Sequence, residues 1–396
     1  MNLGAANHAL HHLSQLLGRL GLLSGGGGDA LNAERMTGFT ADELLGLKPK
    51  VDIPPGSRRS TERIGVLAPD EGGLPVYSLS NQPASLVRAA LSGTTQPMVS
   101  RWGHILVRRA LASRLEAPAS MNAVEFAALR IAALNAMGEF AVARAVAQDI
   151  DTANWTPQLT SAALDSYIGT ADLVGPCPAV RLQGNRREDG TWRLFQGICN
   201  AYAGEAARAK TDIERVRYRG EAANIDALLA QRFAGAAGQG RGAVTIEWDK
   251  VEDMTPLRFA LANAVGEPIP DALMEDAQPY YARSAALAPM LDLPQRIAAS
   301  DVAAREGILS SSALVDLYSQ LYGEQEAEGP EVNRAASLRQ AYVARDAAAR
   351  MAAIRELWAP GAGGAIDYAR LVLTAFAAAR VQPSEDLEDD AGTLIA

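Results

Sequence analysis

The stretch from Phe126 to Ile150 reads FAALRIAALNAMGEFAVARAVAQDI, two runs of small and apolar residues separated by Met137-Gly138-Glu139. Five later glycines interrupt similar runs, and they are Gly169, Gly204, Gly235, Gly266 and Gly307. The successive intervals, counted from Gly138, are 31, 35, 31, 31 and 41 residues. Such an interval holds two short antiparallel helices with their turns, which is the period of a helical repeat. The sequence therefore predicts an all-α fold of stacked antiparallel helix hairpins, with helices that end at these glycines.

A second stretch, from Trp192 to Val216, reads WRLFQGICNAYAGEAARAKTDIERV. Both stretches resemble the tetratricopeptide (TPR) pattern, in which an aromatic residue opens helix A, a glycine ends it, and small residues on helix B allow close packing. The matching positions are Phe126, Leu134, Gly138, Ala141 and Ala145 in the first stretch, and Trp192, Tyr202, Gly204 and Ala207 in the second. The proline that closes helix B in this family is absent from the expected places. Over about residues 120–320, the resemblance implies a TPR-like α-solenoid whose concave surface holds a protein or peptide.

Apolar periodicity places the helical-repeat domain at residues 84–380. Within it, we expect a helix at 157–169 that begins at Asn154 or Thr156, a helix at 270–277, and a loop at 178–190. Residues 25–83 are rich in Gly, Pro and Ser, and this composition predicts a flexible linker with little regular structure. Residues 381–396 are acidic and lack helical spacing, so we expect a solvated, disordered tail.

An amphipathic helix is predicted at residues 1–24. With Ala6, its leucines alternate at spacings of three and four residues, and the leucine seam consists of Leu3, Leu10, Leu13, Leu17 and Leu20. Such a seam favours docking into a partner protein or self-association. Attachment to a membrane surface is the weaker alternative, because Arg19 is the segment's single basic residue.

Two short segments have strand character. Residues 243–248 alternate polar and apolar side chains, and residues 63–67 read Arg-Ile-Gly-Val-Leu. The two segments either pair with each other or leave 243–248 as the first turn of another helix.

Composition narrows the class of partner. The chain of 396 residues is 48% hydrophobic and 21% charged, which predicts a folded, soluble protein, and its net charge is −9. An acidic protein of this kind lacks the basic stripe that nucleic acid requires. No apolar run reaches the roughly 18 residues of a transmembrane helix, and the N-terminus does not resemble an export signal. Arg greatly outnumbers Lys and Ala is abundant, a bias typical of a GC-rich bacterial genome.

The chain has two cysteines, Cys177 and Cys199, and both fall in one repeat unit. Either they form a disulfide or they remain two buried thiols, and we favour the disulfide. A disulfide implies an oxidising compartment, so we expect the periplasm, with the cytoplasm as the alternative.

Motifs for nucleophilic, phosphate or zinc-protease chemistry are absent. Three of the four histidines, His8, His11 and His12, have helical metal-ligand spacing but no acidic or Cys companion, and His104 lacks an evident catalytic partner. We therefore expect no catalytic residue, no cofactor and no metal.

A binding groove is predicted around Trp192, Tyr202, Arg208 and Arg215. Arg208, Arg215 and Arg219 share one helix face, because their spacings are seven and four residues. Such a face either is simply solvated or receives an acidic peptide, including residues 385–390 of this chain.

These observations predict a non-enzymatic scaffold or adaptor in a bacterial envelope assembly, which binds protein partners through its helical stack and its N-terminal helix. The alternative is a helical-toroid enzyme that acts on glycans or peptidoglycan. That enzyme requires two facing carboxylates, for which Asp149 with Asp151 and Asp249 with Asp253 are the candidates.

Overall fold

A computed structural model describes residues 57–184, 187–237, 244–274, 279–324, 328–359 and 366–381. These residues form α-helices and no strand, which confirms the all-α prediction. The helices of the first half are α4 (Ala84–Ser92), α5 (Arg101–Ala112), α6 (Ala123–Ala136), α7 (Phe140–Gln148), α8 (Pro157–Gly169), α9 (Cys177–Gln183), α10 (Gly190–Tyr202), α11 (Ala206–Arg219) and α12 (Asn224–Ala236). Those of the second half are α13 (Pro256–Ala264), α14 (Pro279–Leu287), α15 (Leu293–Glu306), α16 (Ser311–Gly323), α17 (Pro330–Val343), α18 (Ala347–Leu357) and α19 (Tyr368–Ala378).

Local capping explains where several helices begin. The Thr156 hydroxyl accepts a hydrogen bond from the Leu159 amide, and Pro157 occupies the first helical position of α8. Asn122 caps α6 in the same way, because its side-chain oxygen accepts from the amides of Val124 and Glu125. These side chains satisfy amides that the first turn of a helix leaves without a partner. Thr156, one of the two predicted start residues, is therefore the N-cap of α8.

Four of the six recurring glycines end helices in the left-handed conformation, and they are Gly138, Gly204, Gly266 and Gly307. Their φ angles lie between 63° and 89°, where a residue with a Cβ is strained. The other two do not end helices in this way. Gly235 lies inside α12, and Gly169 is the last residue of α8, where Ala171 takes the left-handed position with φ of 52°. A Cβ at Gly169 would overlap the Phe140 ring, so this glycine permits a close approach between helices.

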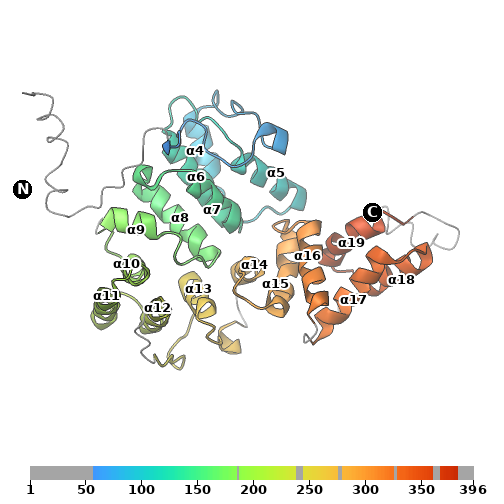
Figure 1. The fold of residues 1–396 in the computed structure, drawn as a ribbon. Coiled ribbons are helices and arrows are strands. Elements are labelled where there is room, and N and C mark those ends of the chain that lie inside the picture. Colours follow the sequence, from blue (N-terminus) through green and yellow to red (C-terminus); the bar gives the residue numbers. More distant parts are fainter. Residues whose placement is uncertain are drawn as a thin grey trace, which may run out of the picture. The chain divides into compact units, whose positions relative to one another are not determined.

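Most consecutive helices pack against one another along the chain, the exceptions being α4 with α5, α8 with α9, and α13 with α14 (Figure 1). Three successive helices are in mutual contact at α6–α8, at α10–α12, at α15–α17 and at α17–α19. The first two of these places contain the stretches that resemble the TPR pattern. Further along, α19 packs against each of α15, α16, α17 and α18, so the last five helices share a core.

Helices that are distant in sequence also touch. α8 contacts α13, and α5 contacts α15. The ring centroids of Phe140 and Tyr280 are 4.9 Å apart, and the Ser284 hydroxyl donates to the Gly169 carbonyl at 2.8 Å. In an open repeat array each unit contacts only its neighbours. This chain therefore departs from such an array where α13, α14 and α15 return to the first helices.

The segment before α4 is irregular but packed. Its described part, residues 57–83, includes the three-residue 3-10 helix Pro69–Glu71 (η2), and the Ile64 side chain is buried. The buried Arg130 guanidinium donates to the carbonyls of Ile64, Leu111 and Ser113 at 2.6–2.9 Å, which fixes this segment on α5 and α6. The described part of the predicted linker is therefore not a free arm. Buried carbonyls and a buried cation satisfy each other here.

Three local predictions were wrong. Residues 244–248 form neither a strand nor the first turn of a helix, and Ile64 and Leu67 make isolated bridges with Leu115 and Ser113. The predicted helix at 270–277 is a three-residue 3-10 helix, Asp271–Leu273 (η5), within the described part of that range. The predicted loop at 178–190 contains most of α9. The docking helix at 1–24 and the acidic segment 385–390 lie outside the described residues.

Candidate interaction surface

Helix α5 has two opposite faces of different character. One face is buried through His104, Leu111 and Ala112. The other carries Trp102 and Leu106, four residues apart, and the exposed Val99 lies just before the N-cap Ser100; we call these three residues the α5 stripe. Trp102 is 73% exposed and Leu106 is 64% exposed, although both are large apolar residues. Helical spacing sets Trp102 and Leu106 on one side of the helix, so two large apolar side chains are exposed together there.

Buried polar groups anchor the opposite face of α5. The His104 Nε2 atom lies 2.8 Å from Glu139 Oε1, and both side chains are almost completely buried. Arg108 donates to the same Glu139 oxygen at 3.2 Å and to the Gly307 carbonyl at 3.0 Å. Glu139 is the N-cap residue of α7, and Gly307 is the C-cap of α15. α5 is therefore fixed to two helices that are far apart in the sequence.

A further bond at the start of α5 strengthens this attachment. The Arg101 Nε atom donates to the Ala304 carbonyl in the last turn of α15 at 3.2 Å. Cationic donors at a helix C-terminus interact favourably with its unpaired carbonyls and its dipole. Because α5 is held in this way, the α5 stripe lies on a rigid element, which favours precise recognition of a partner.

The charged residues of α5 itself are all basic, and of these Arg108 pairs with Glu139. α5 contains Arg101, Arg108 and Arg109 and no acidic residue. The Arg101 guanidinium also lies 6.0 Å from the centre of the Trp102 ring, within range of a cation–π contact. The surface thus combines an apolar centre with basic neighbours, although the whole chain is acidic.

The predicted groove residues do not form one open site. Trp192 is completely buried, and its indole nitrogen donates to the Gly184 carbonyl at 2.8 Å, so it lines no accessible groove. Tyr202 is partly exposed and stacks against Phe233. A buried tryptophan at the start of α10 acts as a core residue that joins α10 to the end of α9.

The predicted basic face is already neutralised. Arg208 pairs with Glu205 at 3.1 Å and with Asp212 at 3.7 Å, and Arg215 pairs with the same Asp212 at 3.1 Å. Arg219 lies 3.7 Å from Glu221. These acids come from the same helix or its flanking turns, so the face has little net charge to offer an acidic peptide.

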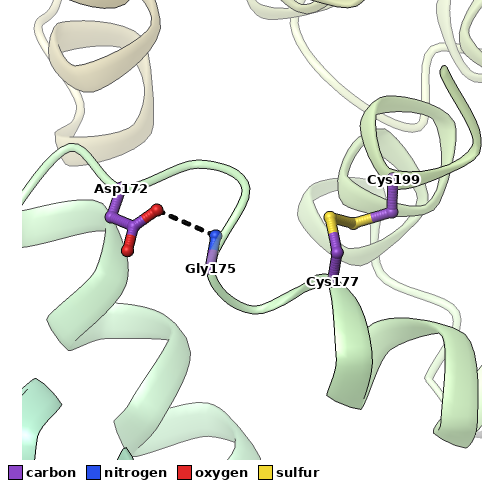
Figure 2. The surroundings of a disulfide bond; sticks show 4 residues. All are labelled: Asp172, Gly175, Cys177 and Cys199. Carbon is purple, nitrogen blue, oxygen red and sulfur yellow. Dashed lines mark hydrogen bonds between the residues drawn. A yellow bond between two sulfur atoms is a disulfide. The ribbon is translucent and has the colours of Figure 1, made fainter. Parts of the chain in front are cut away.

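The structure joins Cys177 and Cys199 by a disulfide, with a Cα–Cα distance of 5.2 Å (Figure 2). The Asp172 carboxylate holds the turn before it, because one oxygen accepts from the Gly175 amide at 2.8 Å. Cys177 then begins α9, and Cys199 lies in α10. The disulfide therefore connects the turn after α8 to the body of the next hairpin.

Asp165 on α8 is an accessible carboxyl whose pKa lies well above its ordinary value. Its side chain is exposed, yet surrounding protein raises its pKa to about 6, while the Arg187 charge lowers it. Burial, followed by the charge of Asp165, raises the pKa of the Tyr280 hydroxyl. Among the described residues, the charged neighbour of Asp165 is thus an arginine and not a second carboxylate.

The carboxylates that the sequence offered as catalytic pairs have structural partners. Asp149 accepts from the Gly65 amide and Asp151 from the Arg59 amide, each at 3.0 Å. Asp253 accepts from the Arg258 guanidinium at 2.8 Å, and Asp249 is exposed. These bonds tie the irregular segment to α7 and stabilise the start of α13.

Within the described ranges, no group of three His, Cys, Asp or Glu side chains has the geometry to hold a metal ion. Along the same part of the chain, no helix combines the length and apolar character that crossing a bilayer requires. His8, His11, His12 and the leucine seam of residues 3–20 lie outside the described residues.

Comparison with known proteins gives no match, since no family model, curated protein or solved structure is similar to this chain.

We did not predict the α5 stripe from the sequence. Its spacing is visible in the sequence, because Val99, Trp102 and Leu106 follow the helical period. However, the same period describes the core face of any helix. Only the packing of α5 on α7 and α15 shows that His104 points inward and Trp102 outward.

Proposed function

We propose that this protein is a non-enzymatic scaffold or adaptor whose helix hairpins form a TPR-like stack, and that the α5 stripe is a docking surface for a partner protein. The carrying observation is that Trp102 and Leu106 stay in water on a helix whose other face is held by buried polar groups, with the exposed Val99 just before the helix. Burying such side chains contributes about 1.5–3 kcal/mol each before ordering costs. Exposed tryptophan on a rigid element is typical of an interface hot spot.

The partner segment that fits this surface is an amphipathic helix with an acidic flank. Its apolar side chains would cover the α5 stripe, as in helix-in-groove recognition. Its acids would face Arg101 and Arg109, since α5 has no acidic residue of its own. Complementary charge of this kind mainly increases the association rate and the specificity. The leucine seam of residues 1–24 remains our proposed second docking element.

We also propose an oxidising compartment, the periplasm of a bacterium, where the protein takes part in an envelope assembly. The support is the pairing of the chain's two cysteines, because disulfides persist mainly outside the cytosol. Thiol titration of natively purified and then denatured protein tests this proposal. Two free thiols per chain would contradict it.

Hydrolysis of glycans is the second candidate. Asp165 favours it, because a carboxyl with a pKa of about 6 suits a general acid. The scaffold proposal is stronger, because Asp165 has Arg187 beside it where this chemistry needs a second carboxylate. A glycan-hydrolysing activity that Asp165→Asn abolishes would make the hydrolase the stronger of the two proposals.

The docking proposal is tested with a photo-crosslinking residue at Leu106 in the native cell, and with the same residue at Tyr218 as a matched control. Tyr218 on α11 is 80% exposed, so it samples a comparable surface away from α5. We expect one protein crosslinked from position 106 alone, through a segment with helical apolar spacing and flanking acids. We also expect Trp102→Ala to reduce the yield of that product at least about tenfold, the scale of a hot-spot side chain.

Several results would refute it. Equal crosslinking from both positions would indicate a nonspecific surface. A product insensitive to Trp102→Ala, or one formed only with a second copy of this chain, would show that the α5 stripe does not bind the proposed partner.

A further inference from the structure

A second surface lies between α16 and α17, where the two helices border a groove of about 230 Å³. Val315, Ala335 and Leu338 are apolar residues that line it, and Leu338 and Ala335 are buried in the core below. Tyr322, Tyr342 and Val343 also line it. Tyr322 is 47% exposed and Val343 is 55% exposed, so apolar surface remains in contact with water along the groove.

Positive charge and an unpaired hydroxyl accompany this apolar surface. The Arg339 guanidinium lies 4.9 Å from the centre of the Tyr322 ring, and within the described residues it has no carboxylate partner. The Tyr342 hydroxyl is buried and finds no hydrogen-bond partner among those residues. Arg380 is near enough to Tyr342 to oppose the rise that burial causes in its pKa. The groove therefore suits an occupant that combines an apolar side chain with carboxylates.

The described chain ends beside this groove. Val381, which follows α19, is buried in a cluster with Ala341 of α17, and Tyr342 packs against the same cluster. Three residues later the sequence reads Ser-Glu-Asp-Leu-Glu-Asp-Asp, residues 384–390, in which five acids surround Leu387. This pattern of one apolar residue among acids complements the apolar lining and the arginine of the groove.

The distances permit the chain to reach its own groove. Leu387 is six residues beyond Val381, and an extended chain covers at most about 3.3–3.6 Å per residue, hence about 20 Å. Along α17, the seven residues from Ala335 to Tyr342 rise by only about 10 Å at 1.5 Å per residue. A tether of this length also gives a high effective concentration, so a weak contact suffices.

We propose that residues 384–390 of this chain occupy the groove between α16 and α17, with Leu387 over Ala335 and Leu338 and the flanking acids facing Arg339 and Arg380. The basic face of α11 is the poorer site for this segment, because Arg208 and Arg215 already pair with acids. The bound segment excludes any other peptide with the same acidic and apolar pattern. The groove is thus closed by the chain itself and independent of the α5 stripe.

Hydrogen exchange of the full chain, followed by mass spectrometry, tests this contact. We expect the amides of residues 385–390 to exchange at least about tenfold more slowly in the native chain than in Arg339→Glu. Arg208→Glu is the matched control, because it reverses an exposed arginine on α11 and should leave these amides as slow as in the native chain. Leu387→Ala, outside the described helices, should accelerate them as Arg339→Glu does.

Three outcomes would overturn the proposal. Exchange of residues 385–390 at the rate of an unfolded chain would show that the segment is free. An equal effect of Arg208→Glu and Arg339→Glu would show that only net charge matters. Protection that disappears on dilution would show that the segment binds a second copy and not its own groove.

Discussion

Replacement of Asp165 by asparagine should stabilise this protein at neutral pH. Surrounding protein raises the pKa of this carboxyl from 3.8 to about 6, so its charged form is disfavoured in the folded state. At 1.36 kcal/mol per pKa unit, a shift of this size corresponds to about 3 kcal/mol. Because Asp165 is exposed, solvent screening reduces this figure, and we expect a gain of about 1 kcal/mol at pH 7.

The pH dependence of the free energy of unfolding tests whether Asp165→Asn stabilises the protein. Between pH 3.8 and about 6 the folded state binds this proton more tightly than the unfolded state, so the free energy of unfolding falls as pH rises through that window. Below pH 3.8 the carboxyl is neutral in both states, and above about pH 6 it is charged in both. The advantage of Asp165→Asn should therefore be absent at low pH and complete at pH 7.

Urea denaturation from pH 3.5 to 7.5 measures this difference, and Asp367→Asn is the control of opposite sign. Bonds from Arg305, whose guanidinium donates to both Asp367 oxygens, lower the pKa of Asp367 to about 2. Its contribution is present above pH 3.8 and is lost as pH falls towards 2, so Asp367→Asn should destabilise the protein at pH 7. An Asp165→Asn protein that gains nothing at pH 7, or that keeps its gain at pH 3.5, would refute the reasoning.

Three further changes test the packing. Replacing both cysteines with alanine should lower the free energy of unfolding by about 3 kcal/mol, the chain-entropy value for a 22-residue separation, and equal melting of the two proteins would contradict it. Gly204→Ala should lower the free energy of unfolding by about 1 kcal/mol, measured by denaturant unfolding, because the φ of Gly204 is +86°. Gly138→Ala should lower it more, because the new Cβ would lie 2.5 Å from Arg283 Cδ. Equal decreases for the two substitutions would contradict this crowding. Arg130→Met should cost about 3 kcal/mol, since three buried carbonyls lose their charged donor, and fast amide exchange at residues 64–67 would identify the cause.

The sequence alone determined the features that depend on neighbouring residues. Apolar spacing predicted the helices, Asn154 and Thr156 were the two predicted start residues of α8, of which Thr156 is the N-cap, and Gly138 and Gly204 predicted two helix ends. Each of these signals acts through hydrogen bonds or backbone angles within a few residues, so the local sequence contains the whole cause. The same reasoning brought Cys177 and Cys199 together as candidates within one hairpin.

Only the tertiary structure decided which faces are covered and which charges are free. Gly169 belongs to the same series as Gly138, yet it permits the approach of Phe140, and the left-handed position after α8 falls to Ala171. Trp192 and Trp102 both begin helices, but packing buries the first and leaves the second in water. Arg208 and Arg339 are both exposed arginines, and acids neutralise only the first among the described residues. These differences depend on contacts between segments far apart in the chain, which helical periodicity leaves undetermined because every amphipathic helix repeats the same pattern.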